Sequence, residues 1–141
     1  MQVGALLALL AAKGVRAAEL AGFAAAMRAR MCPCPADGPV VDIVGTGGDG
    51  HNTLNFSTAA SILAASCGAR VAKHGNVSVS SMSGSANVLE SLGIRMLDAD
   101  KVVECLNQCN IAFMFAPRFH PAMRHVVPVR KALKVRSAVP G

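Results

Sequence analysis

An apolar segment that runs directly into a glycine-rich loop constrains the fold of this chain more than any other feature. Residues 40–44 contain four β-branched residues and predict a buried strand. Residues 45–50 add four glycines, whose backbone can bend sharply and turn N–H groups toward a ligand. Ser57 or Thr58 then caps a predicted helix to about Cys67, whose N-terminus attracts anions. Together they predict a phosphate-binding turn, with an unliganded βα turn as the alternative.

The segments around this turn alternate between strand and helix with short joints. A strand–helix–strand order of this kind predicts βαβ units and a parallel sheet. The last strand is apolar throughout, so we expect it to be buried on both faces. The expected elements are strands over residues 69–72 and 111–116, and helices over residues 86–92 and from Asp98 or Asp100 to Leu106.

Both ends of the chain are predicted to be helical. Residues 1–31 predict two helices separated near Gly14, and the apolar run at 3–12 is too short to span a bilayer and predicts a buried helix. Residues 32–39 hold three prolines and form the expected linker. A basic helix, kinked at Pro128, is expected near the C-terminus. The predicted fold class is therefore α/β, a parallel sheet with flanking helices preceded by part of a small all-α domain.

The positive charge of the chain gathers near its C-terminus. The net charge is +6, and after Glu104 there are six basic residues and no acidic one. Such a surface suits anions, and we expect a small anionic ligand rather than nucleic acid because Trp and Tyr are absent. A solvated helix face is the alternative interpretation, in particular for Arg124 and Lys131.

The five cysteines indicate a reduced setting, since their number is odd. A four-thiolate zinc site made by Cys32, Cys34, Cys105 and Cys109 is an alternative, although these spacings are not those of common zinc motifs. The sequence contains no Ser-His-Asp or Cys-His pattern for nucleophilic catalysis.

Five motifs in this order resemble the anthranilate phosphoribosyltransferase family, and the resemblance runs from about residue 2 to residue 136. They are Gly-Thr-Gly-Gly-Asp at 45–49, Asn-Phe-Ser-Thr at 55–58, Lys-His-Gly-Asn at 73–76, Ser-Gly-Ser-Ala at 83–86, and Phe-Ala-Pro-Arg-Phe-His-Pro-Ala-Met-Arg-His-Val at 115–126.

The resemblance implies an activity in tryptophan biosynthesis. The family transfers ribose 5-phosphate from phosphoribosyl pyrophosphate to the amine of anthranilate, with Mg2+ as cofactor and pyrophosphate as product. It also implies a partial helical domain at residues 1–36 and the first part of an α/β catalytic domain at residues 37–141. Departure of pyrophosphate leaves an oxocarbenium-like sugar, so the protein must stabilise the leaving charge more than supply a base.

The resemblance further implies which residues bind which substrate, and none acts as a catalytic base or nucleophile. The residues expected to bind phosphoribosyl pyrophosphate are Gly45, Gly47, Gly48, Asp49, Asn55, Ser57, Thr58, Lys73 and Ser85, with Ser57 also a magnesium ligand. The residues expected to bind anthranilate are Gly45, Asn76, Ala116, Pro117, His120 and Arg130.

Several of these residue types have equally good structural interpretations. A structural role explains His74 and His120 as well as contact with a substrate does. Asp42 is expected to cap or brace the glycine loop.

Val77 stands where the family usually has Arg, which removes a cation beside the site.

The resemblance also sets expectations for the whole protein. The chain looks like a fragment truncated at both ends, without the family's Asp-Glu pair for magnesium, and we expect it to be inactive alone. Further expectations are small-molecule substrates, no nucleic acid or membrane partner, a homodimer for full-length relatives, and a cytoplasmic or plastid location. A pyrimidine nucleoside phosphorylase-like enzyme and a non-enzymatic anion or nucleic-acid binding module are the alternatives.

Overall fold

The computed structural model describes residues 2–45, 54–77 and 84–133. Contacts divide the chain into two compact units. A helical unit combines Met1–Met31 with His120–Gly141, and an α/β unit is formed by Cys32–Phe119. The division into domains at residue 36 stays a prediction.

Four helical segments make up the described part of the helical unit, and they confirm two helices on either side of Gly14. Gly14 has φ +77°, a left-handed conformation that favours glycine. Lys13 at the end of the first helix forms an ion pair of 2.6 Å with Glu19 of the second. The segments are α1 (Gln2–Lys13), α2 (Ala17–Arg28), the 3-10 helix η1 (Pro121–His125) and α7 (Val127–Leu133).

Two expectations for this unit are wrong in detail. The apolar run at 3–12 is helical but has no buried residue, because α1 meets α7 along the stripe around Gly4 and leaves Leu9 67% exposed. The basic helix is not continuous, since η1 and α7 are separate. Pro128 does not kink a helix but is the second residue of α7, where its missing N–H costs no helical hydrogen bond.

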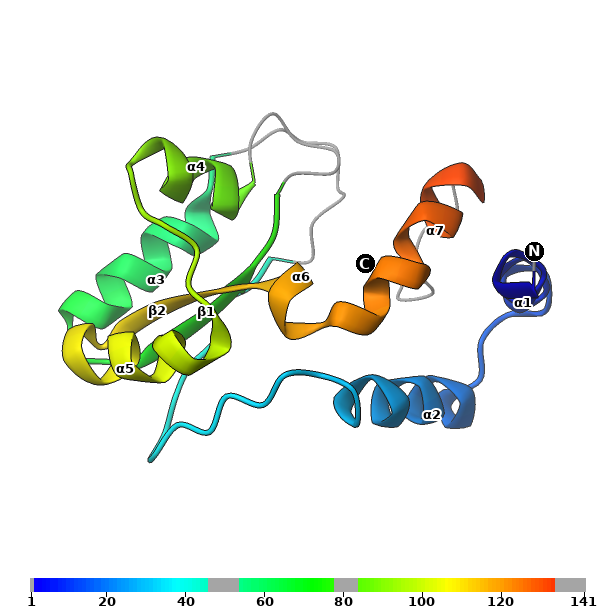
Figure 1. Cartoon of the computed structure of the whole chain (residues 1–141), viewed down its shortest axis with the longest axis horizontal. Helices are drawn as coiled ribbons and strands as arrows, with labels where there is room; N and C mark the ends of the chain where they lie inside the picture. The colour runs from blue at the N-terminus through cyan, green and yellow to red at the C-terminus, as the bar shows by residue number, and fades with distance from the viewer. Residues whose placement is uncertain (1, 46–53, 78–83, 134–141) are drawn as a thin grey trace. The chain divides into compact units, whose positions relative to one another are not determined.

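A parallel pair of strands forms the centre of the α/β unit (Figure 1). Strand β1 (Val71–Gly75) pairs with β2 (Ile111–Phe115), with Val71 opposite Ile111. Val41 adds a parallel bridge on β1: its N–H donates to the Arg70 carbonyl at 2.9 Å. The α/β class and the parallel sheet are therefore confirmed.

The strands differ from the prediction in extent and burial. Residues 40–44 contribute only the bridge at Val41, and they are not buried, since nothing described covers their outer side and Val44 is 58% exposed. Strand β1 begins two residues later than predicted and continues to Gly75. Strand β2 has a single buried residue, Ala112, and is not buried on both faces.

Three longer helices and a short one complete the α/β unit (Figure 1). Asn55, rather than Ser57 or Thr58, occupies the position before the first helix, and Asp98 begins a later one as predicted. The helices predicted to end near Cys67 and at residue 92 do end there, and each is followed by a glycine with a positive φ angle, Gly68 and Gly93. The helices are α3 (Phe56–Ser66), α4 (Ser85–Ser91), α5 (Ala99–Cys109) and α6 (Ala116–Phe119).

The core of this unit lies between α5, β2 and α6. Its fully buried members are Val102, Leu106, Ala112 and Phe119. Half-buried Cys32, Cys34 and Cys105 pack against it. All five cysteines are free thiols, and the part of the chain described contains no group of three His, Cys, Asp or Glu residues that could hold a metal ion. The structure thus gives no support to the zinc alternative.

The helices within the described ranges are all too short or too polar to cross a bilayer.

Candidate functional site

A buried lysine lies at the centre of the candidate site. Lys73 is the middle residue of β1 and is only 3% exposed. Its Nζ donates to the carbonyl oxygen of Ile43 at 2.7 Å and to Oγ of Ser57 at 3.2 Å. Burial lowers the pKa of Lys73, and the negative charge of Asp42 partly opposes this.

The surroundings of Lys73 suit an incoming anion. Both of its hydrogen-bond partners within the described ranges are uncharged oxygens. A desolvated ammonium whose described hydrogen-bond partners carry no charge gains strongly from a negatively charged ligand. Its contacts also bring together two segments on either side of the glycine loop, because Ile43 precedes the loop and Ser57 follows it.

Two helix N-termini meet beside this lysine. Thr58 in the first turn of α3 is 3% exposed, and its Oγ1 lies 3.0 Å from Oγ of Ser85, the first residue of α4. Ser61 is fully buried and donates to the carbonyl of Ser57 at 2.7 Å, which fixes the same turn. The exposed N–H groups and positive dipole ends of helices attract anions.

Gly75 at the end of β1 allows this close approach, and the sequence analysis assigned it no role. A Cβ atom at Gly75 would lie 2.5 Å from Cε2 of Phe113 and 3.2 Å from Cβ of Ser85. A side chain there would have to displace the ring of Phe113 and would crowd the first residue of α4. The available signal was a glycine at the end of a strand, which marks a close approach of neighbouring groups.

The structure describes some of the other candidates, among them the anthranilate candidate Asn76, and leaves the rest outside the described residues. Asn55 is the residue before α3. Asn76 follows β1, and its carbonyl accepts from the N–H of Ala86 at 3.2 Å, which ties it to α4. Gly45 is exposed. Gly47, Gly48 and Asp49 lie outside the described residues.

The residues predicted to bind anthranilate are divided between the two units. Ala116 and Pro117 lie on α6 of the α/β unit, and Asn76 follows β1 of the same unit. His120 and Arg130 belong to the helical unit. The Nε atom of Arg130 is buried without a hydrogen-bond partner in the described part of the chain, so it has a donor available.

Asp42 contacts β1, whereas its predicted role of capping or bracing the glycine loop falls mostly outside the described residues and stays a prediction. Its Oδ1 accepts from the N–H of His74 at 3.0 Å, and its Oδ2 lies 4.0 Å from Nδ1 of the same residue. The ring of His74 meets Phe119 edge to face with centroids 6.0 Å apart. These contacts favour a structural role for His74.

A magnesium ion would find few ligands among these residues. Ser57 offers one hydroxyl oxygen, and that oxygen already accepts from Lys73. No cluster of acidic or imidazole ligands accompanies it in the described ranges. Because Mg2+ commonly binds through one or two carboxylates plus substrate phosphates, these residues alone do not form a magnesium site.

Known proteins resemble this chain over nearly its whole length. Anthranilate phosphoribosyltransferase of Herpetosiphon aurantiacus is 55% identical over 137 residues, which are 96% of this chain and 40% of the relative. The crystal structure of anthranilate phosphoribosyltransferase from Thermus thermophilus superposes with a TM-score of 0.88 at 46% identity, covering 96% of this chain and 42% of that one.

A third comparison concerns a liganded structure. Anthranilate phosphoribosyltransferase from Saccharomyces cerevisiae, in complex with PRPP and Mg, superposes with a TM-score of 0.72 at 36% identity. The match covers 82% of this chain and 33% of the yeast chain. This chain thus spans about 40% of the length of the curated relatives it matches.

The pattern of the glycosyl transferase family, a/b domain, matches residues 37–139, and the chain therefore belongs to this glycosyl transferase family.

Proposed function

We propose that this chain supplies the donor-binding part of an anthranilate phosphoribosyltransferase, which makes phosphoribosylanthranilate and pyrophosphate for tryptophan biosynthesis. The observation that carries the proposal is the buried ammonium of Lys73 beside the first turns of α3 and α4. A polyphosphate would supply the negative charge that neither described hydrogen-bond partner of Lys73 carries. The 55% identity to the Herpetosiphon aurantiacus enzyme supports this choice of reaction.

The proposed reaction breaks one bond at the sugar and forms another. The bond between C1 of the ribose and the pyrophosphate oxygen breaks, and its electron pair leaves with pyrophosphate. The amine nitrogen of anthranilate bonds to C1 and then loses a proton. Lys73 and the N–H groups at the start of α3 stabilise the leaving charge. Attack by the amine then needs positioning more than it needs a strong base.

The acceptor side of the proposal rests on Arg130. A guanidinium pairs well with a carboxylate through two parallel N–H donors. Arg130 has an unused, buried Nε–H within the described ranges, and it is our candidate for the carboxylate of anthranilate. The other proposed acceptor contacts are Gly45, Asn76, Ala116, Pro117 and His120.

Magnesium enters the proposal through the donor. The yeast relative was solved with PRPP and Mg, and Ser57 is our candidate for a protein ligand. The other ligands of the ion would come from the phosphates of the donor and from residues outside those described. When bound, the ion would neutralise phosphate charge.

We expect the 141 residues alone to bind the donor but to turn it over far more slowly than a whole enzyme. The sequence has no Asp-Glu pair, and the described residues gather no acidic cluster for the metal. Homodimerisation and small-molecule substrates without nucleic acid are further parts of the proposal.

A thermal-shift experiment distinguishes this function from its nearest alternative. Phosphoribosyl pyrophosphate with Mg2+ should raise the melting temperature of the chain, because ligands that bind only the folded state stabilise it. Uridine plus inorganic phosphate should raise it by no more than phosphate alone. The reverse result would favour a pyrimidine nucleoside phosphorylase-like function and contradict the proposal.

A further inference from the structure

The helical unit has a strongly uneven charge. Its two sequence segments hold six arginines and three lysines against a single acidic residue, Glu19. Glu19 is already engaged, because its carboxylate accepts from Lys13 at 2.6 Å and from the N–H of Arg16 at 3.0 Å. The other basic side chains of this unit have no acidic residue of the same unit left to pair with, and such a surface attracts anions.

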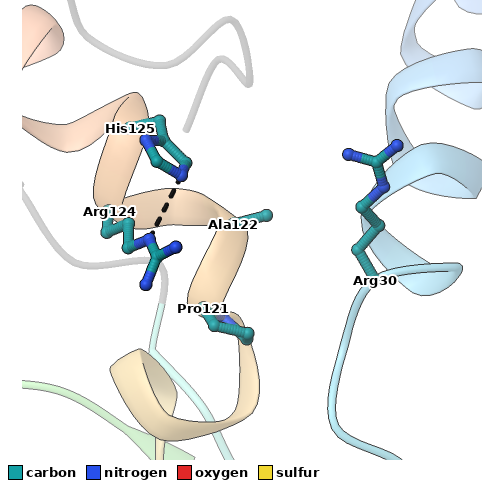
Figure 2. A pocket seen from close by; sticks show the side chains of 5 residues that line it. All are labelled: Arg30, Pro121, Ala122, Arg124 and His125. Atoms are coloured by element: carbon teal, nitrogen blue, oxygen red, sulfur yellow. Dashed lines mark hydrogen bonds between the residues drawn. The ribbon is translucent and has the colours of Figure 1, made fainter.

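A pocket of about 250 Å³ lies within this unit. Figure 2 shows Arg30, just after α2, across the pocket from the η1 segment that carries the other lining residues. Three of the five lining side chains are basic types, and none is acidic. The lining residues are Arg30, Pro121, Ala122, Arg124 and His125.

One hydrogen bond arranges the donors of this pocket. Nε of Arg124 donates to Nε2 of His125 at 3.1 Å (Figure 2). Because Nε2 of His125 accepts in this bond, Nδ1 is the ring nitrogen that is left to contact a ligand. The terminal nitrogens of Arg124 remain as donors, and neither Arg30 nor Arg124 forms an ion pair within the described ranges.

We propose that this pocket binds a small polyvalent phosphate anion of about the size of pyrophosphate. The guanidinium groups of Arg30 and Arg124 lie on opposite walls and together offer more N–H donors than one carboxylate can accept. A diphosphate has oxygens at both of its ends and can accept from both walls at once. The lining contains no Phe, Tyr or Trp, the side chains on which nucleic-acid bases most often stack. This inference uses none of the residues of the Lys73 site, so either site can exist without the other.

The test uses inorganic pyrophosphate and the full 141-residue chain that carries Lys73→Met. This background weakens binding at the proposed donor site, so that calorimetry reports on the pocket. We expect one equivalent of pyrophosphate to bind. Adding Arg30→Gln and Arg124→Gln should weaken that binding at least about tenfold, because each removes charged hydrogen bonds to the ligand.

The matched control is the pair Arg28→Gln and Lys131→Gln. It removes the same charge from exposed positions of the helical unit that do not line the pocket. We expect this control to change the dissociation constant less than about threefold through screened long-range attraction. An equal loss in both double variants would show that only net charge matters, and would overturn the proposal.

A second measurement does not depend on how the variants fold. In proton NMR of the unmutated chain, pyrophosphate should shift the ring signals of His125, assigned with His125→Gln. Unchanged His125 signals at saturating pyrophosphate would overturn the proposal. So would binding of an RNA oligonucleotide with a steep salt dependence when pyrophosphate does not bind.

Discussion

Oγ1 of Thr58 lies 3.0 Å from Oγ of Ser85, and this hydrogen bond joins the first turns of α3 and α4, which are 27 positions apart in the sequence. The pair holds two helix N-termini at the end of β1, where the absence of a side chain on Gly75 lets Phe113 and Ser85 approach closely. Lys73 is tied to the same place through Ser57, the residue before Thr58. The architecture thus places a buried cation and helix dipoles where a polyphosphate would lie.

Removing the hydrogen bond between Thr58 and Ser85 should destabilise the site without creating a cavity in the core. Thr58→Val keeps the shape but removes the hydroxyl, and we expect a loss of about 1 kcal/mol in the free energy of unfolding. Urea unfolding of Thr58→Val, Ser85→Ala and the double variant measures the coupling between the two residues. Ser66→Ala is the control, since its exposed hydroxyl bonds only to a carbonyl in its own helix. Strictly additive effects of the two substitutions would contradict a coupled pair.

A side chain at Gly75 should be harmful. Gly75→Ala brings a methyl group into the space of Phe113 and Ser85, and overpacking of this kind costs about 1–3 kcal/mol in unfolding free energy. Phe113→Leu in the same chain should restore part of the loss, because it removes the ring atoms that clash. Gly22→Ala is the control, since nothing lies within 4 Å of its Cβ position and it sits in a helix. A Gly75→Ala chain as stable as the parent would refute the close approach.

Because of Lys73, the free energy of unfolding of the chain should change with pH in the alkaline range. Burial lowers the pKa of Lys73 in the folded state, with Asp42 opposing. Between that lowered pKa and the ordinary lysine value, the unfolded chain binds more protons than the folded chain. The free energy of unfolding therefore gains a contribution that rises with pH across this window, and below the window the cost of the buried charge is fully present.

The measurement is urea unfolding at a series of alkaline pH values for the parent and for Lys73→Met. Other titrating groups cancel in the difference between the two. The parent should gain stability relative to the variant as the pH rises through the window. Parallel pH profiles would show that the buried lysine does not titrate as described.

Much of the α/β unit could be predicted from local sequence signals. Gly68 and Gly93 mark helix ends because they adopt positive φ angles that other residues avoid. The helix start at Asp98 follows the preference of Asp for the position before a helix, although its carboxylate accepts from Arg118 rather than capping the helix. The parallel order of the strands follows from the short βαβ joints. Lys73 and Ser57 were candidates before the structure placed them 3.2 Å apart.

The rest depends on contacts between residues far apart in the sequence. The β-branched residues at 40–44 favour a strand, but burial needs neighbours on both sides, and Val41 alone pairs with β1. Composition could not show that Pro128 falls in the first turn of a separate helix. Nor does any local pattern reveal that Arg30 and Arg124 line one pocket, because they come from opposite ends of the chain.

The measurement that tests the central claim most directly is calorimetric titration of the 141-residue chain with phosphoribosyl pyrophosphate and Mg2+, for the parent, Lys73→Met and an Arg118→Gln control. The control removes a cation of the same unit that is bound to Asp98 at 2.7 Å, away from Ser57. We predict saturable binding by the parent, a loss of at least about tenfold in affinity for Lys73→Met, and little change for the control. Equal binding by the parent and Lys73→Met would contradict the claim that Lys73 holds the phosphates of the donor.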